Sequence, residues 1–247
     1  MSTELVKSPF DGEVQLPVGQ VGDDSDFAQP TSGQGLKQLR FVSKGLSAKK
    51  GFIPPGHYTM TEPGAAKDEA IDLGKAVQVV PLARRMKAID YSDRENVLVS
   101  FDAKSDLYQT IKDKSDDIDN DCLEGVSFLV VEESTGDVME FYVIGGPTVR
   151  AVVNQIYPYL QLTQDQIDRR GLKDVKPHGP LPLTLASRKR VNSKGEWHVP
   201  KVEHSSASFT NAPSLDVVTN AVQSFVNEKG RSGPKVVENA EMQGRAR

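Results

Sequence analysis

The residues most suited to chemistry in this sequence are cations grouped around a few aromatic rings. Between Ser187 and Lys201 five basic residues stand against one acidic residue, Glu196, a local net charge of +4. The basic residues are Arg188, Lys189, Arg190, Lys194 and Lys201. Trp197, the one tryptophan of the chain, lies among them. Cations that follow phosphates and flat rings on which bases stack are what sequence-tolerant binding of single-stranded nucleic acid needs. The segment predicts such a surface, with Trp197 as the stacking platform.

A second basic group lies on the long strand-like run 75–91. Side chains alternate between the two faces of a strand, so Arg85, Lys87 and Tyr91 share one face and Val80 and Leu82 the other. Because two adjacent arginines cannot both point into a core, we expect Arg84 or Arg85 to be solvated or to bind a ligand. Arg84, Arg85, Lys87 and Tyr91 therefore complete the set of candidate nucleic-acid-binding residues.

Both groups also have a simpler interpretation. Trp197 could cover the hydrophobic core while the cations around it form a solvated strand edge that discourages aggregation. The arginines of the run 75–91 could likewise belong to an ordinary exposed strand that needs no ligand.

Enzymatic and metal chemistry have little support in the sequence. One cysteine, Cys122, excludes an internal disulfide and a multi-cysteine zinc site, and we expect it to be a small buried residue. The four histidines form no HxxxH or HxH pair. The acidic segment 102–121 lacks the central glycine and final glutamate of a calcium loop, which predicts a solvated loop. We expect no enzyme, no cofactor and no metal.

Composition sets the remaining limits. The 247 residues are 37% hydrophobic and 26% charged, with a net charge of −4. No apolar run approaches the roughly 18 residues of a spanning helix, and the start of the chain has no signal-peptide pattern, so we expect a soluble, cytoplasmic protein without membrane contact. Local fields rather than the total charge decide which partner approaches which face, so the acidic total does not exclude nucleic acid.

Local patterns predict two hairpins separated by a helix. Two β-rich runs within 125–146 flank a turn at 133–137, and the runs 182–191 and 196–204 flank a turn at 192–195. Between them, apolar residues recur from Val149 to Leu160 at helical spacing. A short helix should follow Ser214 and end at Gly230.

The order of strands, hairpin, helix and hairpin is that of an OB-fold barrel, whose helix lies between the third and fourth strands. We therefore expect a mainly β, OB-like barrel over residues 51–212 and a C-terminal helix over 213–230. Residues 1–50 should be flexible, apart from a short docked element at 36–46, and 231–247 should form a flexible tail. A mixed α+β domain of other connectivity is the alternative.

Four runs of sequence carry a family resemblance: VVPLARRMKAIDY, the acidic stretch leading to Cys122–Gly125, FLVV…MEFYVIGGPTVRAV and LTLASRKRVNSKGEWHVPKV. Over roughly residues 50–205 they resemble OB-fold single-stranded-DNA-binding proteins of tailed bacteriophages. The resemblance implies a phage protein of DNA replication or recombination, acting in the host cytoplasm on single-stranded DNA and on proteins of those processes. Phage and bacterial proteins of this kind commonly end in an acidic recruiting tail, whereas this sequence ends EMQGRAR.

Two other function classes remain open. A phage protein-interaction factor, for host takeover or assembly, could use the same fold without nucleic acid. An enzyme, such as a nuclease accessory subunit, is disfavoured because no carboxylate pair with a lysine and no nucleophile–base arrangement stands out. The sequence leaves open whether the chain forms a homo-oligomer.

Overall fold

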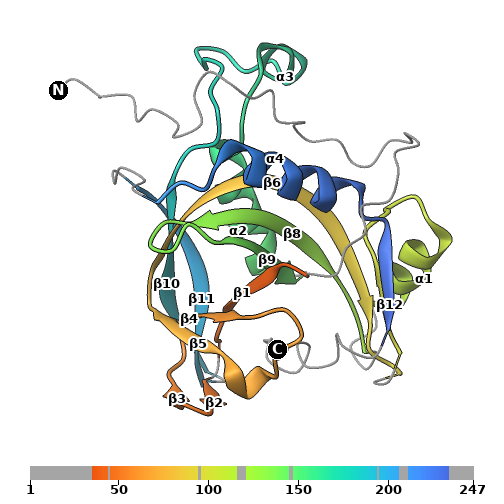
Figure 1. Cartoon of the computed structure of the whole chain (residues 1–247), viewed down its shortest axis with the longest axis vertical. Helices are drawn as coiled ribbons and strands as arrows, with labels where there is room; N and C mark the ends of the chain where they lie inside the picture. Colours follow the sequence, from red (N-terminus) through yellow and green to blue (C-terminus); the bar gives the residue numbers. More distant parts are fainter. Residues whose placement is uncertain are drawn as a thin grey trace.

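Ten strands form one strongly curled sheet, which has the shape of a half-barrel (Figure 1). The computed structural model describes residues 35–43, 45–93, 96–115, 121–144, 147–193, 195–205 and 211–233. Along the main path the strand order is β11-β10-β6-β8-β9-β1-β4-β5, with β7 paired to β6 and β12 paired to β7. A separate two-stranded sheet joins β2 to β3. The mainly β, barrel-like class predicted from the sequence is confirmed.

The strands of the structure are β1 (Lys37–Phe41), β2 (Leu46–Ala48), β3 (Gly51–Ile53), β4 (Tyr58–Thr61), β5 (Ile71–Gly74), β6 (Val77–Asp90), β7 (Val97–Ser100), β8 (Cys122–Glu132), β9 (Val138–Ile144), β10 (Leu183–Asn192), β11 (Gly195–His204) and β12 (Gly230–Gly233). The helices are α1 (Asp106–Ser115), α2 (Pro147–Ile156), α3 (Gln164–Arg169) and α4 (Leu215–Asn227), with short 3-10 turns η1 (Lys67–Glu69) and η2 (Tyr157–Tyr159).

Strand β6 organises the sheet because it pairs with β8 along most of its length on one edge and with β10 and β7 at the two ends of its other edge. Its register with β8 shifts between Pro81 and Ala83. Proline has no N–H to give to a ladder, so a β-bulge is favoured there, and a bulge bends its strand.

The inner, concave face holds the largest core cluster. Helix α2 packs Val152 and Ile156 against side chains from the inner face, among them Phe128, Phe141 and Leu183. Tyr58 of β4 is fully buried, and its hydroxyl donates a 2.8 Å hydrogen bond to the carbonyl of Ala186 in β10. This bond ties the two ends of the curled sheet together.

The outer, convex face is covered by α4, which lies across β6 and β8 in Figure 1. Val218, Val222 and Phe225 of α4 pack against Leu82 and Leu129 of the sheet. The predicted C-terminal helix is therefore present. Beyond it, β12 adds to the edge of β7, so this part of the chain belongs to the sheet.

The N-terminal boundary at residue 51 is corrected by β1. This strand is internal to the sheet, antiparallel to β4 and parallel to β9, and its Leu39 is fully buried. Five residues with polar neighbours give little periodic signal, so only the distant partners of β1 define it as a strand. The flexibility predicted for residues 1–34 and 234–247 lies outside the described residues.

The connectivity resembles the predicted order up to the final closure. Strands β6, β8 and β9 form a meander, α2 follows, and β10 of the last hairpin returns to pair antiparallel with β6. The second edge of β9 is occupied by β1, so within the described residues β9 and β11 do not pair. Strands β1, β4 and β5 extend the sheet where an OB barrel would close.

We expect Leu39→Ala to lower the free energy of unfolding by about 2–5 kcal/mol, the usual cost of emptying a buried leucine site. Leu107→Ala on α1, where the leucine is 40% exposed, is the matched control and should cost much less. Urea denaturation of both variants measures the difference. Equal, small losses would contradict the placement of β1 inside the sheet.

Candidate nucleic-acid interface

The structure divides the predicted binding residues among three places: the β10–β11 hairpin, the covered outer face of the sheet, and a pocket beside η2. Lys194, at the turn of the hairpin, lies outside the described residues. Most of the predicted binding residues that the structure describes lie on the β10–β11 hairpin: Arg188, Lys189, Arg190, Trp197 and Lys201.

The outer half of the β10–β11 hairpin projects from the body of the protein. The two strands pair without interruption from Leu183↔His204 to Asn192↔Gly195. Leu183 is fully buried, whereas every residue of β10 from Arg188 to Asn192 is exposed. Consecutive residues of the ribbon therefore offer their side chains to solvent on both faces.

One face of this ribbon combines the tryptophan with cations. Arg190 lies directly opposite Trp197, and Arg188 directly opposite Val199. Lys201 lies opposite Ala186, two residues further along the same face. Directly opposed residues in an antiparallel pair project to the same side. We call the surface formed by Arg188, Arg190, Trp197 and Lys201 the Trp197 face.

Part of the opposite face of the ribbon, at Ser187 and His198, lies against the rest of the molecule. Gly56, in the turn between β3 and β4, has a φ of +86°, and a Cβ there would lie 2.5 Å from Ser187 Oγ and 2.7 Å from the His198 ring. Only glycine permits so close an approach in this backbone conformation. Because Ser187 faces this turn, Arg188 next to it faces the other way.

Ion pairs distinguish the lysines of the hairpin from its arginines. Lys189 pairs with Glu196 at 2.6 Å, and Lys201 pairs with Glu203 at 2.6 Å. Such exposed pairs are weak and exchange easily for another anion. Arg188 and Arg190 have no carboxylate partner in the part of the chain that the structure describes. The two arginines of the Trp197 face are thus the cations most available to a ligand.

Trp197 itself is half-buried, beside Val199, which is 8% exposed. The residue is therefore partly covered and keeps part of its surface accessible. Stacking and core-covering are both compatible with this position.

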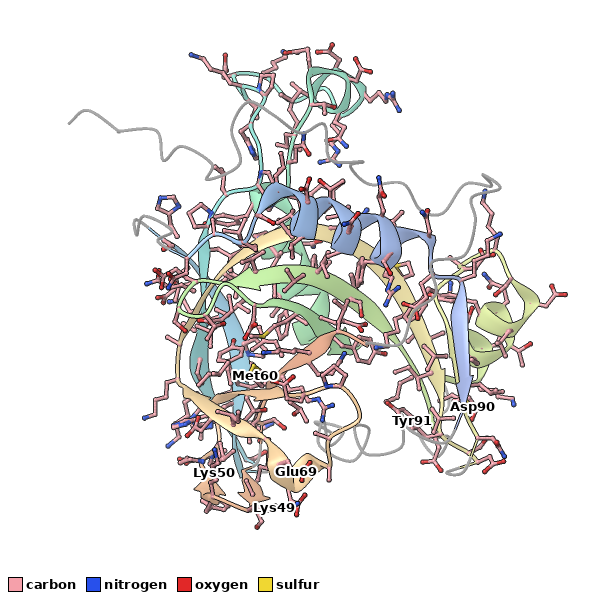
Figure 2. The ribbon with its side chains drawn as sticks, viewed as in Figure 1. Lys49, Lys50, Met60, Glu69, Asp90 and Tyr91 are labelled. Atoms are coloured by element: carbon pink, nitrogen blue, oxygen red, sulfur yellow. The ribbon has the colours of Figure 1, made fainter. Side chains whose placement is uncertain are left out.

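Sequence reasoning missed a neighbouring tip formed by β2 and β3. Phe52 there is 67% exposed, and Lys49 pairs with Glu69 at 2.7 Å, whereas Lys50 has no carboxylate partner among the described residues. Figure 2 labels Lys49, Lys50 and Glu69 at this tip. The contact of Gly56 with the hairpin brings the β3–β4 turn against β10–β11. The basic residues of 36–50 were a signal for this tip, but they lay in a region predicted to be flexible.

The solvent-facing strand expected at Arg85, Lys87 and Tyr91 is corrected, since the three residues are 7–8% exposed. Arg85 donates hydrogen bonds to the Phe225 carbonyl at 2.7 Å and to the Glu228 carboxylate at 2.8 Å. The predicted separation of Val80 and Leu82 from Arg85 is wrong, because the bulge between Pro81 and Ala83 interrupts the alternation of β6. Leu82 and Arg85 therefore lie on the same face, which α4 and the residues after it cover. We leave these three residues out of the interface.

Arg85 and Lys87 are buried next to a carboxylate whose charge they neutralise. Glu140 of β9 has no exposed surface, and Lys87 Nζ lies 2.8 Å from its Oε1, with Arg85 at 3.6 Å. Burial alone would raise the pKa of Glu140, but the charges of Lys87 and Arg85, with hydrogen bonds from Lys87 and Ser127, lower it overall. Arg85 and Lys87 are therefore counter-ions of Glu140.

Arg84 points to the other side of β6, as alternation requires. Its guanidinium carbon lies 4.6 Å from the centre of the Tyr157 ring, in a pocket remote from the hairpin. One of the two adjacent arginines is thus buried with carboxylates, and the other is stacked on an aromatic ring.

Metal-ligating side chains do not cluster in the part of the chain that the structure describes. The described residues contain no group of three or more His, Cys, Asp or Glu side chains that could hold a metal ion. None of the helices described is long and apolar enough to cross a membrane.

Cys122 is buried, as predicted. Burial together with Asp90 raises the pKa of its thiol to about 11, so the thiol stays protonated near neutral pH.

Comparison of the chain with protein-family models, with curated proteins and with solved structures gives no match. Function must therefore be inferred from the geometry of the site.

We expect Glu140→Gln to lower the free energy of unfolding at pH 7 by about 3–5 kcal/mol, because it removes the carboxylate beside buried Lys87 and one of the two carboxylates beside Arg85. The folded-state pKa of Glu140 lies below its unfolded value, so its stabilisation is present above the ordinary carboxylate range and is lost as the pH falls through the folded value. The variant should consequently lose less stability on acidification than the wild type. Urea denaturation over a pH series tests this.

Glu203→Gln is the control for the removal of a charge. It removes an exposed carboxylate paired with Lys201 and should cost about 0–1 kcal/mol. A Glu140→Gln protein with the stability and acid response of the wild type would show that Arg85 and Lys87 do not depend on this carboxylate.

Proposed function

We propose that the protein binds single-stranded DNA, with little sequence preference, through the Trp197 face of the β10–β11 hairpin. The observation that carries this proposal is the direct pairing of Arg190 with Trp197 on a projecting ribbon, with Arg188 two residues away on the same face. Neither arginine is paired with a carboxylate in the described residues. A flat ring beside two available guanidinium groups is suited to bind a base and its flanking phosphates at once.

The energetics favour single strands over duplex. A base stacked on an aromatic side chain contributes about 1–3 kcal/mol, and this contribution needs an unpaired base. Contacts of the arginines with phosphates release counter-ions from the strand and make affinity depend on salt. The local charge of the hairpin serves this role although the whole chain is acidic.

An OB-like core is part of the proposal. It is supported by the β6–β8–β9 meander, by α2 between β9 and β10, and by the pairing of β10 with β6. In this arrangement β1, extended by β4 and β5, occupies the edge of β9 that would pair with the last hairpin in a closed OB barrel. The outer half of the β10–β11 hairpin is therefore free to project.

The cellular role that we propose follows from the resemblance of residues 50–205 to phage proteins. The protein would cover single strands during phage DNA replication or recombination in the host cytoplasm, beside proteins of the same processes. It performs no catalysis itself.

The second candidate, a phage protein-interaction factor, is favoured by one observation. Val191 at the hairpin tip is 65% exposed and Phe52 at the β2–β3 tip is 67% exposed. Exposed apolar side chains at projecting tips are suited to contact another protein. The two candidates differ in whether the arginines of the Trp197 face affect binding of an oligonucleotide.

Oligo(dT) should bind more tightly than a duplex of equal length, and its affinity should fall as salt rises. The double variant Arg188→Ala/Arg190→Ala should bind at least about tenfold more weakly, with a salt slope reduced by about 1–2, because two phosphate contacts are lost. Titrations at several salt concentrations give both numbers.

The control removes the same charge elsewhere, with Lys112→Ala/Arg169→Ala on the exposed surfaces of α1 and α3. It should bind like the wild type. Equal affinity for oligo(dT) and duplex, or equal binding by both double variants, would favour the protein-interaction candidate.

Trp197→Ala separates stacking from packing. If the indole stacks on a base, affinity for oligo(dT) should fall by about 1–3 kcal/mol while the melting temperature changes little, and Trp197→Phe should restore part of the affinity. If the indole covers the core, the variant should instead lose about 3–5 kcal/mol of stability. Fluorescence of Trp197 during titration and thermal melting decide between these outcomes.

A further inference from the structure

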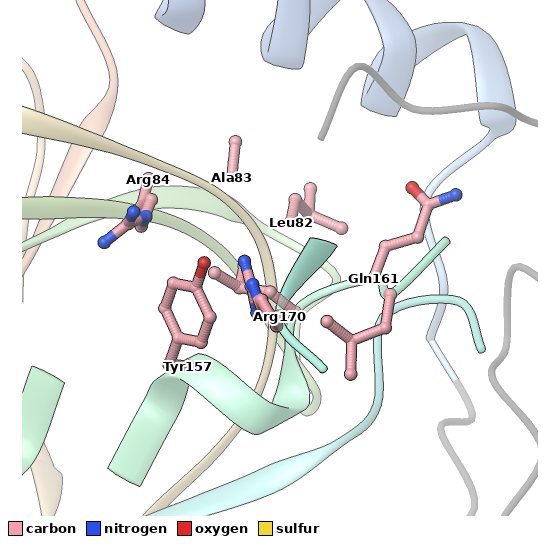
Figure 3. A pocket seen from close by; sticks show the side chains of 8 residues that line it. Leu82, Ala83, Arg84, Tyr157, Gln161 and Arg170 are labelled. Carbon is pink, nitrogen blue, oxygen red and sulfur yellow. The ribbon is translucent and has the colours of Figure 1, made fainter. Parts of the chain in front are cut away.

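Two arginines share one aromatic ring at a place away from the Trp197 face. The guanidinium carbons of Arg84 and Arg170 lie 4.6 Å and 4.2 Å from the centre of the Tyr157 ring. Arg84 comes from β6, Tyr157 from η2 after α2, and Arg170 from the end of α3. In Figure 3 the ring of Tyr157 lies between the two labelled arginines. Three separate parts of the chain thus bring two cations together.

Neither of these cations is paired with a carboxylate among the described residues. By contrast, Arg169, next to Arg170 in sequence, pairs with Asp165 at 3.7 Å. Burial lowers the pKa of Arg84, and burial together with the charge of Arg84 lowers the pKa of Arg170. The ring offsets part of this cost through cation–π attraction. An anion at the edge of the ring, within reach of both guanidinium groups, would offset the remainder.

The same arginines line a cavity of about 20 Å³. Gln161 also lines it, and its Oε1 is buried without a hydrogen-bond partner among the described residues. Leu82 and Leu160 supply apolar walls. The volume admits one water-sized group, so a single oxygen of a larger anion can enter while the rest stays at the mouth. Figure 3 shows Arg84, Gln161 and Arg170 around this space.

We propose that Arg84, Tyr157, Gln161 and Arg170 form an oxyanion site that takes a phosphate group. The planar fork of each guanidinium matches two phosphate oxygens, and stacking on Tyr157 holds both forks in place. A hydroxyl on the anion, as in hydrogen phosphate, supplies the donor that Gln161 Oε1 lacks. Carboxylate ligands fit less well because they bring no such donor when ionised.

The phosphate group can come from a free phosphate compound or from the terminal phosphate of a nucleic acid, because an internal phosphodiester carries no hydroxyl to donate to Gln161 Oε1. The site does not rest on the proposed function of the hairpin. Strand β10 leaves β6 near Val77 and runs toward the hairpin tip, whereas Arg84 lies beyond Val79 in the opposite direction along β6. A strand that reached both surfaces would have to cross the body of the molecule.

The test uses thermal melting of the full chain in inorganic phosphate and in chloride at equal ionic strength and pH. At ten times the dissociation constant, phosphate should raise the melting temperature of the wild type by roughly 3–6 °C, and the rise should saturate. Arg84→Gln and Arg170→Gln should abolish the rise. Arg169→Gln, which removes the neighbouring exposed and paired arginine, should retain it.

Two results would overturn the proposal. One is a wild type that responds alike to phosphate and chloride, and the other is a full phosphate response in Arg170→Gln. Because Arg170 is exposed, this variant should fold even where Arg84→Gln does not. Broadening of the ³¹P signal of phosphate by the wild type, and its absence with Arg170→Gln, gives a second measurement that does not depend on melting.

Titration with 5′-phosphorylated oligo(dT) distinguishes the two sources. A loss of oligo(dT) affinity in Arg170→Gln but not in Arg169→Gln supports the site with a nucleic-acid phosphate as its ligand. Unchanged oligo(dT) affinity beside a lost phosphate response supports the site with a free phosphate compound. Failure of the hairpin function, seen as wild-type binding by the Arg188/Arg190 variant, leaves the phosphate response as it is.

Discussion

A carboxylate that is wholly removed from water governs the outer face of the sheet. Glu140 forms ion pairs with Lys87 and Arg85 of β6. It also accepts hydrogen bonds from the Ser127 hydroxyl of β8 and the Gln38 amide of β1. An unpaired charge in this place would cost several kcal/mol, so these strands must meet in one register. A slip of one residue would turn Lys87 to the opposite face of the sheet. The polar cluster thus specifies an arrangement that apolar packing alone would leave less defined.

The same chain uses its cations in three different ways, and the environment of each decides which. Arg85 neutralises buried carboxylates, Arg84 rests on an aromatic ring, and Arg190 extends into solvent beside Trp197. Arg84 and Arg85 are neighbours in sequence, but a strand turns them to opposite sides. Net charge and basic runs therefore say little about binding until each cation has been matched to its anion.

Local patterns allowed much of this fold to be predicted. Turn residues at 133–137 and 192–195 defined both hairpins, and helical spacing after Ser214 defined α4. The parts that were missed depend on contacts between distant residues, as in the pairing of β1 with β9. Nothing near Arg170 in the sequence indicates that it will meet Tyr157. For the same reason, the cover that α4 places over Arg85 could not be read from β6 alone.

The late position of α4 and β12 has a consequence for synthesis on the ribosome. Every strand that surrounds Glu140 is made before residue 205, but the residues that cover this face, 215–233, emerge later. Until then the nascent sheet presents Leu82 and Leu129 to solvent, together with polar groups that are still hydrated. Such exposed apolar surface is what chaperones bind and what drives aggregation. The packing of this face is therefore completed only when residues 215–233 have emerged, and translational pausing before residue 215 would prolong its most vulnerable stage.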